Sequence, residues 1–144
     1  MPESVVRRVR RGPATAATVE AVHDDLDGMW AEADFVPEAD RMAFTLAVVE
    51  AAANVVAHAV PAAEAPLELE VELTAGAFRL EARVYELNAA PAEVDLTSGA
   101  DAGVHGESGR GLSLIQALVS TVVFERHGND NVWVLRRDSS GHRS

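Results

Sequence analysis

Three polar residues follow one another at four-residue steps in an otherwise apolar segment of the chain: Glu50, Asn54 and His58. Each step turns a side chain by about 40° around a helix of about 3.6 residues per turn, so the three side chains would share one flank. A carboxylate can accept the proton of a hydroxyl group, and an amide oxygen can bind a hard divalent cation. This spacing therefore predicts a helix whose flank carries acid–base or metal-binding chemistry.

An apolar stripe accompanies these polar residues. Its members recur at steps of three and four, the spacing of one helix face: Met42, Leu46, Val49, Ala53, Val56 and Val60. We expect this stripe to face the protein core, with the polar flank at its edge and the surrounding alanines leaving space for a ligand. The alternative is that Glu50 and Asn54 are solvated positions on a half-exposed helix.

A second segment with binding chemistry is rich in glycine and leads directly into another amphipathic helix. Its notable residues are Gly106, Gly109, Arg110 and Gly111. Backbone N–H groups and the positive end of the dipole at a helix N-terminus bind phosphate, and glycines let the backbone approach the anion closely. Arg110 adds a charged group suited to phosphate. The segment predicts a phosphate site, although many glycine-rich turns only cap a helix.

A third candidate lies at the end of a predicted hairpin. Apolar and polar residues alternate along residues 67–74 and again along 78–85, which predicts two strands with one buried and one solvated face. On this pattern Glu86 points inward with Val84, and an inward carboxylate needs a partner. A register slip that exposes Glu86 is the alternative.

The elements that must position these residues follow from the same patterns. The sequence predicts an edge strand at Val5–Arg10, helices at Ala14–Ala33 and Glu38–Ala59, a hairpin turning at Ala75-Gly76, a third helix after Gly111, and strands at 122–126 and 132–137. In the hairpin Glu72 would face Arg79. Residues 127–131 would form the last turn. The arginines of the first strand are interpreted as protection of a sheet edge by charge.

Two motifs carry a family resemblance. The segments LAVVEAAANVVAH (residues 46–58) and GRGLSLIQALV (residues 109–119) resemble the N box and G2 box of the GHKL ATPase superfamily, which includes gyrase, histidine kinases and MutL. More narrowly, the chain resembles the anti-sigma-factor serine/threonine kinases of bacterial partner-switching systems, over roughly Val5 to Arg137.

The resemblance implies a histidine-kinase-like fold, a two-layer α/β sandwich with helices on one face of a mixed, mostly antiparallel sheet. It implies ATP and Mg²⁺ as cofactors, Glu50 as the general base, Asn54 as the Mg²⁺ ligand and Glu86 as the acceptor for the adenine amino group. It assigns the phosphates to the glycine-rich segment, namely to Gly106, Gly109, Arg110 and Gly111.

Two departures from the family pattern keep a second hypothesis open. Glu86-Leu87-Asn88 stands where the family has Asp-x-Gly, so Asn88 would have to supply the positive φ of the missing glycine. Asn129-Asp130 stands where the family often has Gly-Thr, and an acid near the phosphates would repel them unless it faced solvent. The first hypothesis is a kinase that phosphorylates a serine or threonine on an anti-anti-sigma (STAS) protein and sequesters a sigma factor. The second is a non-catalytic binding module with weakened or lost nucleotide binding.

Composition narrows the class of protein. A length of 144 residues suits one domain, predicted over residues 1–138 with a disordered tail at 139–144. Zero cysteines exclude disulfides and thiolate metal sites. A formal net charge of −11 argues against a nucleic-acid surface and suits a basic protein partner. No signal core or membrane-spanning segment is evident, so we expect a cytoplasmic protein that binds neither nucleic acid nor membrane. A homodimer stays open.

Overall fold

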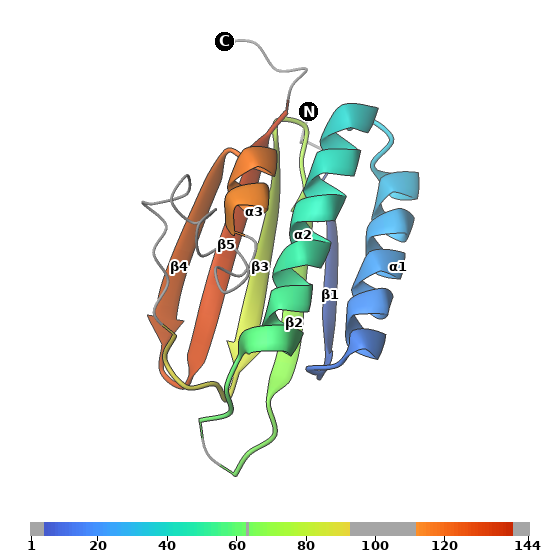
Figure 1. Cartoon of the computed structure of the whole chain (residues 1–144). Coiled ribbons are helices and arrows are strands. Elements are labelled where there is room, and N and C mark those ends of the chain that lie inside the picture. Colours follow the sequence, from blue (N-terminus) through green and yellow to red (C-terminus); the bar gives the residue numbers. More distant parts are fainter. Residues whose placement is uncertain (1–4, 63, 93–111, 140–144) are drawn as a thin grey trace.

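One sheet with helices on a single face makes up the part of the chain that the computed structural model describes, residues 5–62, 64–92 and 112–139 (Figure 1). The elements are β1 (Val6–Pro13), α1 (Ala16–Glu32), α2 (Glu38–His58), β2 (Glu68–Ala75), β3 (Arg79–Leu87), α3 (Leu112–Leu118), β4 (Thr121–His127) and β5 (Asp130–Asp138). The strand order is β1-β2-β3-β5-β4, and each pairing between these described strands is antiparallel. The predicted two-layer α/β sandwich is confirmed.

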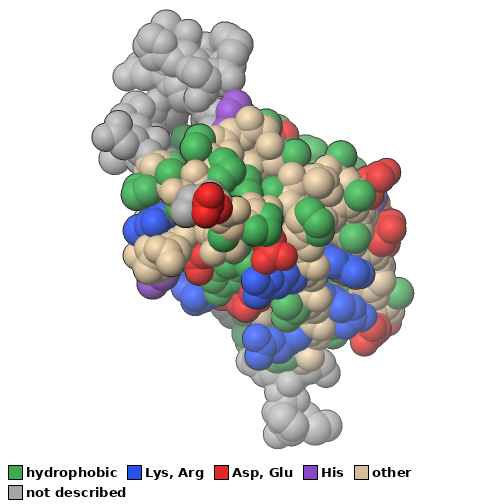
Figure 2. Space-filling model, turned by 90° about the horizontal axis from the view of Figure 1, so that it is seen from below, with side chains coloured by type: hydrophobic (Ala, Val, Ile, Leu, Met, Phe, Trp, Pro, Cys, Tyr) green, Lys and Arg blue, Asp and Glu red, His purple; other side chains and the backbone are tan. Residues whose placement is uncertain are grey.

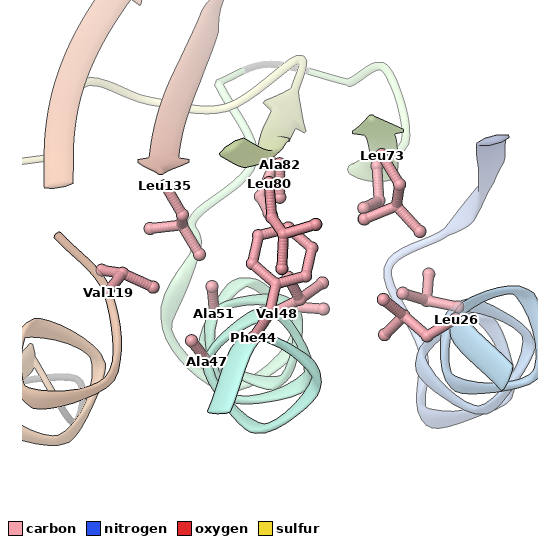
Figure 3. Close-up of a cluster of buried hydrophobic side chains, with 14 of the residues drawn as sticks. Leu26, Phe44, Ala47, Val48, Ala51, Leu73, Leu80, Ala82, Val119 and Leu135 are labelled. Carbon is pink, nitrogen blue, oxygen red and sulfur yellow. The ribbon is translucent and has the colours of Figure 1, made fainter. Parts of the chain in front are cut away.

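The core lies between α2 and the middle of the sheet. Phe44, Val48 and Ala51 of α2 point toward Leu80 of β3 and Leu135 of β5 (Figure 3). All five side chains are at most 2% exposed. The central helix therefore lies against the central strands, with α1 and α3 on either side of it (Figure 1).

The prediction that the apolar stripe of α2 faces the core is wrong, because the stripe lies on the outer face of the helix. Met42 is 67% exposed, Leu46 48% and Val60 60%. The buried face consists of Phe44, Ala47, Val48, Ala51, Ala52 and Val55. This helix is apolar on two faces, and the alanines of the inner face let its backbone approach the sheet closely. Ala47, Ala51 and Ala52 therefore fill the core side of α2.

The β2–β3 hairpin keeps its predicted faces but turns later than expected. Ala75 pairs with Leu80, and the Gly76 N–H donates to the Arg79 carbonyl at 2.9 Å, so the predicted two-residue turn is wrong. Glu72 consequently faces Arg83 and not Arg79. The register differs from the predicted one by an even number of residues, and an even shift leaves each side chain on its original face.

Strand β1 is an edge strand, as predicted, and its residues Arg8, Arg10 and Arg11 are paired with acids. Arg10 binds Asp25 of α1 with its Nε 2.8 Å from the carboxylate, and Arg11 binds Glu68 of β2 at 2.7 Å. Figure 2 shows basic side chains gathered in the lower half of the view, which is the sheet side of the molecule, with acidic side chains among them. The ion pairs of Arg10 and Arg11 therefore connect the edge strand β1 to α1 and β2.

A buried ion pair fixes the start of α2 against the far end of the sheet. Asp40 is fully buried and accepts a hydrogen bond from Arg137 Nε of β5 at 2.8 Å. Arg137 Nη1 also donates to the Leu118 carbonyl at the end of α3, at 2.6 Å. One guanidinium thus connects α2, α3 and β5. Among the described helices, none combines the length and the apolar character needed to cross a lipid bilayer.

Candidate functional site

The polar flank of α2 lies on the side of the helix away from α1. Thr45 marks the α1 side, because its hydroxyl accepts a hydrogen bond from Trp30 Nε1 at 2.9 Å. Asn54 comes about two and a half turns later, so it points to the opposite side, where α3 packs. Asn54 is 6% exposed, while Glu50 and His58 are half-buried. The predicted shared flank is therefore real and lies partly inside the protein.

Glu86 is fully buried at the end of β3, which confirms its predicted inward direction. Its Oε1 accepts a hydrogen bond from Asn131 Nδ2 at 2.9 Å, and its Oε2 accepts one from Trp133 Nε1 at 2.8 Å. Asn131 in turn donates to the Ala90 carbonyl at 2.9 Å and accepts from Arg126 Nη1 at 3.0 Å. Burying a carboxylate costs free energy unless it is hydrogen-bonded, and this network supplies that compensation.

Sequence reasoning missed Asn131 and Trp133. It placed Asn131 in a turn over residues 127–131, whereas the turn between β4 and β5 contains only Gly128 and Asn129, with φ of 60° at Gly128. The sequence signal that could have revealed them is the alternation of inward and outward side chains along a strand. Asn131, Trp133 and Leu135 share the inner face of β5, where they lie opposite Glu86, Val84 and Ala82 of β3. Extending the strand pattern by two residues would have placed the amide beside the carboxylate.

The two departures from the family pattern are physically coupled. Asn88 has a φ of 59°, as predicted for the position of the missing glycine. Its backbone N–H donates to Asp130 Oδ1 at 3.0 Å, and its side-chain amide donates to the Pro66 carbonyl at 3.2 Å. Asp130 therefore stabilises the turn after β3, and its carboxylate is engaged there by a backbone donor.

Backbone hydrogen bonds tie the end of α2 to the end of β3. The Ala62 N–H donates to the Asn88 carbonyl at 2.9 Å, and the Ala90 N–H donates to the Val60 carbonyl at 2.7 Å. Helix α3 packs against α2 as well, and Arg137 connects the end of α3 at Leu118 to Asp40 at the start of α2. The end of α2, the helix that carries Glu50 and Asn54, therefore lies beside the end of β3, the strand that carries Glu86. Gly106, Gly109, Arg110 and Gly111 lie outside the described residues, and so does the predicted tail at 139–144 except for Ser139, whose N–H donates to the Phe78 carbonyl at 2.9 Å.

Comparison with protein families agrees with this arrangement. The family model for the histidine kinase-like ATPase domain matches residues 12–137, which is most of the chain. The chain belongs to the histidine kinase-like ATPase domain family. A comparison with curated proteins finds no match. Membership of this family implies an ATP-binding domain with an ATP-using kinase or ATPase activity.

The residues present suit the ligands that a histidine kinase-like ATPase domain implies. Within the described residues, the half-buried Glu50 carboxylate has no hydrogen-bond or ion-pair partner. Glu50 and Asn54 both offer oxygen atoms, which are the ligands that Mg²⁺ prefers. A carboxylate has about four lone-pair positions, and Asn131 and Trp133 each donate to one oxygen of Glu86. The individual roles of these residues stay predictions.

Proposed function

We propose that this protein is an anti-sigma regulatory factor with serine/threonine kinase activity. The observation that supports the proposal is that the end of α2, the helix with Glu50 and Asn54, is hydrogen-bonded to the end of β3, the strand with Glu86, while α3 packs against the same helix. Membership of the histidine kinase-like ATPase domain family supports ATP as the nucleotide. The N-box and G2-box sequences at residues 46–58 and 109–119 support the narrower assignment.

In this proposal the residues of α2 do the chemistry and the rest of the site binds ATP. When bound, Mg²⁺-ATP supplies the γ-phosphoryl group, with its charge spread over metal and protein donors. A Glu50 carboxylate oxygen would accept the proton that the attacking hydroxyl releases. The Asn54 amide oxygen would bind the metal. The glycine-rich segment would hold the phosphates through backbone N–H groups and Arg110.

The proposed protein partners are a sigma factor and an anti-anti-sigma (STAS) protein whose serine or threonine receives the phosphoryl group. The resemblance of the two motifs to anti-sigma kinases supports both partners. The formal net charge of −11 is consistent with a basic protein surface on one of them. The proposed place of action is the cytoplasm.

A specific observation favours a second candidate, a non-catalytic module that binds a regulator without using ATP. Both oxygens of Glu86 already accept hydrogen bonds, from Asn131 and Trp133. The backbone N–H of Asn88 is likewise engaged by Asp130. If these internal bonds replace those to adenine, nucleotide affinity falls, because an imperfect hydrogen bond in a buried site costs about 1–3 kcal/mol.

Calorimetric titration with ATP, with and without Mg²⁺, separates the two candidates when it is followed by transfer of labelled phosphate to a purified STAS protein. For the kinase, Glu50→Ala should abolish transfer and keep ATP binding, and Asn54→Ala should weaken binding only when Mg²⁺ is present. Glu38→Ala, an exposed carboxylate on the first turn of the same helix, is the matched control and should behave as wild type. Transfer at the wild-type rate by Glu50→Ala would refute the assigned base. Absence of ATP binding by the wild type would favour the module.

A further inference from the structure

An open groove runs along the seam between α1 and α2. It has a volume of about 430 Å³, with Trp30, Thr45 and Val49 along the seam and Met42 and Leu46 of α2 beside them. A second hollow continues it along α1 and shares His23 and Val49 with the first. The two hollows form one elongated, mainly apolar groove, and we call it the α1–α2 groove.

The outer face of α2 is the reason for regarding this groove as a binding surface. Met42 and Leu46 are 67% and 48% exposed although their spacing is that of a buried helix face. A helix that is apolar on both faces is normally covered on both, whereas the sheet covers only the inner face of α2 in the described structure. Large side chains gathered on an exposed face typically mark an interaction site.

The charges around the groove indicate what covers it. Glu20, Asp24 and Asp27 follow the α1 side, and the side chains of His23, Asp24 and Asp27 lie within 4.8 Å of one another. Arg41 is the cation among the lining residues, and its Nε donates to the Val36 carbonyl at 2.7 Å at the α1–α2 turn. The acidic rim therefore favours a partner that brings positive charge.

We propose that the α1–α2 groove binds an amphipathic helix of a partner protein. The apolar stripe of that helix, repeating at i, i+3 or i+4 and i+7, lies on Met42, Leu46 and Val49. Lysine or arginine residues on its flank face Asp24 and Asp27. The opposite charge would speed association and select against acidic helices.

This surface is separate from the proposed catalytic site. The groove lies on the Thr45 side of α2, whereas Asn54 points to the side where α3 packs. A partner helix in the groove and a nucleotide on the other flank could therefore be bound together. The failure of one proposal leaves the other standing.

A labelled synthetic helical peptide with a leucine stripe and lysine flanks tests the proposal by fluorescence anisotropy, with a second peptide that has glutamate at each lysine position. The lysine peptide should bind the full chain, and the glutamate peptide should bind at least roughly tenfold more weakly. Met42→Ser with Leu46→Ser should weaken binding about tenfold or more, since about 1.4 kcal/mol of lost contact is tenfold. Asp24→Asn with Asp27→Asn should reduce both affinity and its salt dependence. Val9→Ser removes a side chain that is 60% exposed on the other face of the sheet, and it is the control that should bind normally.

The two tryptophans provide an internal check by NMR. The lysine peptide should shift the indole N–H signal of Trp30, which lines the groove, and leave that of Trp133, which binds Glu86. Equal binding of the two peptides, or wild-type affinity in the Met42 and Leu46 variant, overturns the proposal. Self-association that the same variant abolishes, without binding of the lysine peptide, also overturns it, because the occupant is then a second copy of the chain.

Discussion

Replacing Glu86 by glutamine is the sharpest test of the buried network, because it changes one oxygen and almost no volume. In the described part of the chain the carboxylate accepts hydrogen bonds from Asn131 Nδ2 and Trp133 Nε1, among its contacts. In Glu86→Gln one of these donors meets an amide NH₂ and loses its acceptor. Asn131 cannot correct this by turning its amide over, since its oxygen would then face the Ala90 carbonyl and its NH₂ would face Arg126.

The expected loss of stability follows from that count. A hydrogen bond to a charged group contributes about 1.5–3 kcal/mol, and a buried donor without an acceptor costs about 1–3 kcal/mol. The lost hydrogen bond and the unpaired donor are the same change, so the two values are not added. We therefore expect Glu86→Gln to lower the free energy of unfolding by about 2–3 kcal/mol. For a chain of this size that corresponds to a fall in Tm of roughly 5–10 °C.

Urea unfolding followed by tryptophan fluorescence measures this loss, and Trp133 reports the site directly. Glu125→Gln, an exposed carboxylate on the edge strand β4, is the matched control and should stay within about 0.5 kcal/mol of wild type. A loss below about 0.5 kcal/mol in Glu86→Gln would refute the reasoning, because it would mean that the carboxylate is not what satisfies the two donors.

Two further predictions concern the turn after β3 and the solvated face of the sheet. Asn88→Ala should destabilise the fold by about 1 kcal/mol more than Asn88→Gly, because alanine resists a positive φ and glycine does not; chemical denaturation of both variants checks this, and equal losses would contradict it. Burial raises the pKa of Glu81, but hydrogen bonds from Arg136 and Arg83 outweigh it, so the pKa lies below its ordinary value of 4.5. A lowered pKa stabilises the fold above pH 4.5, and this contribution disappears as the pH falls through the folded-state pKa. Glu81→Gln should therefore be less stable than wild type at neutral pH, by up to about 1 kcal/mol, and this difference should vanish in acid. Unfolding free energies measured at pH 7 and pH 3 check this, and a difference that stays constant would contradict it.

The sequence by itself determined the local elements and the faces of the strands. The helix predicted over Glu38–Ala59 ends one residue earlier in the structure, at His58. The inward direction of Glu86 was predictable even though the hairpin turn was placed wrongly, because strand side chains alternate with a period of two and the error in register was even. The four-residue spacing of Glu50, Asn54 and His58 likewise fixed a shared flank before any tertiary contact was known.

Only the tertiary structure decided which apolar face of α2 is buried and what surrounds Glu86. Periodicity shows that a helix has apolar faces, but α2 has two of them. The face with Ala47 and Ala51 packs against the sheet, because alanines allow a close approach, and the face with Leu46 is exposed. The bonds from Asn131 and Trp133 to Glu86 join residues more than forty positions apart in the sequence. Such contacts depend on which strands are neighbours in the sheet, and here β5 lies between β3 and β4. The alternation of residues along one strand does not determine the order of the strands.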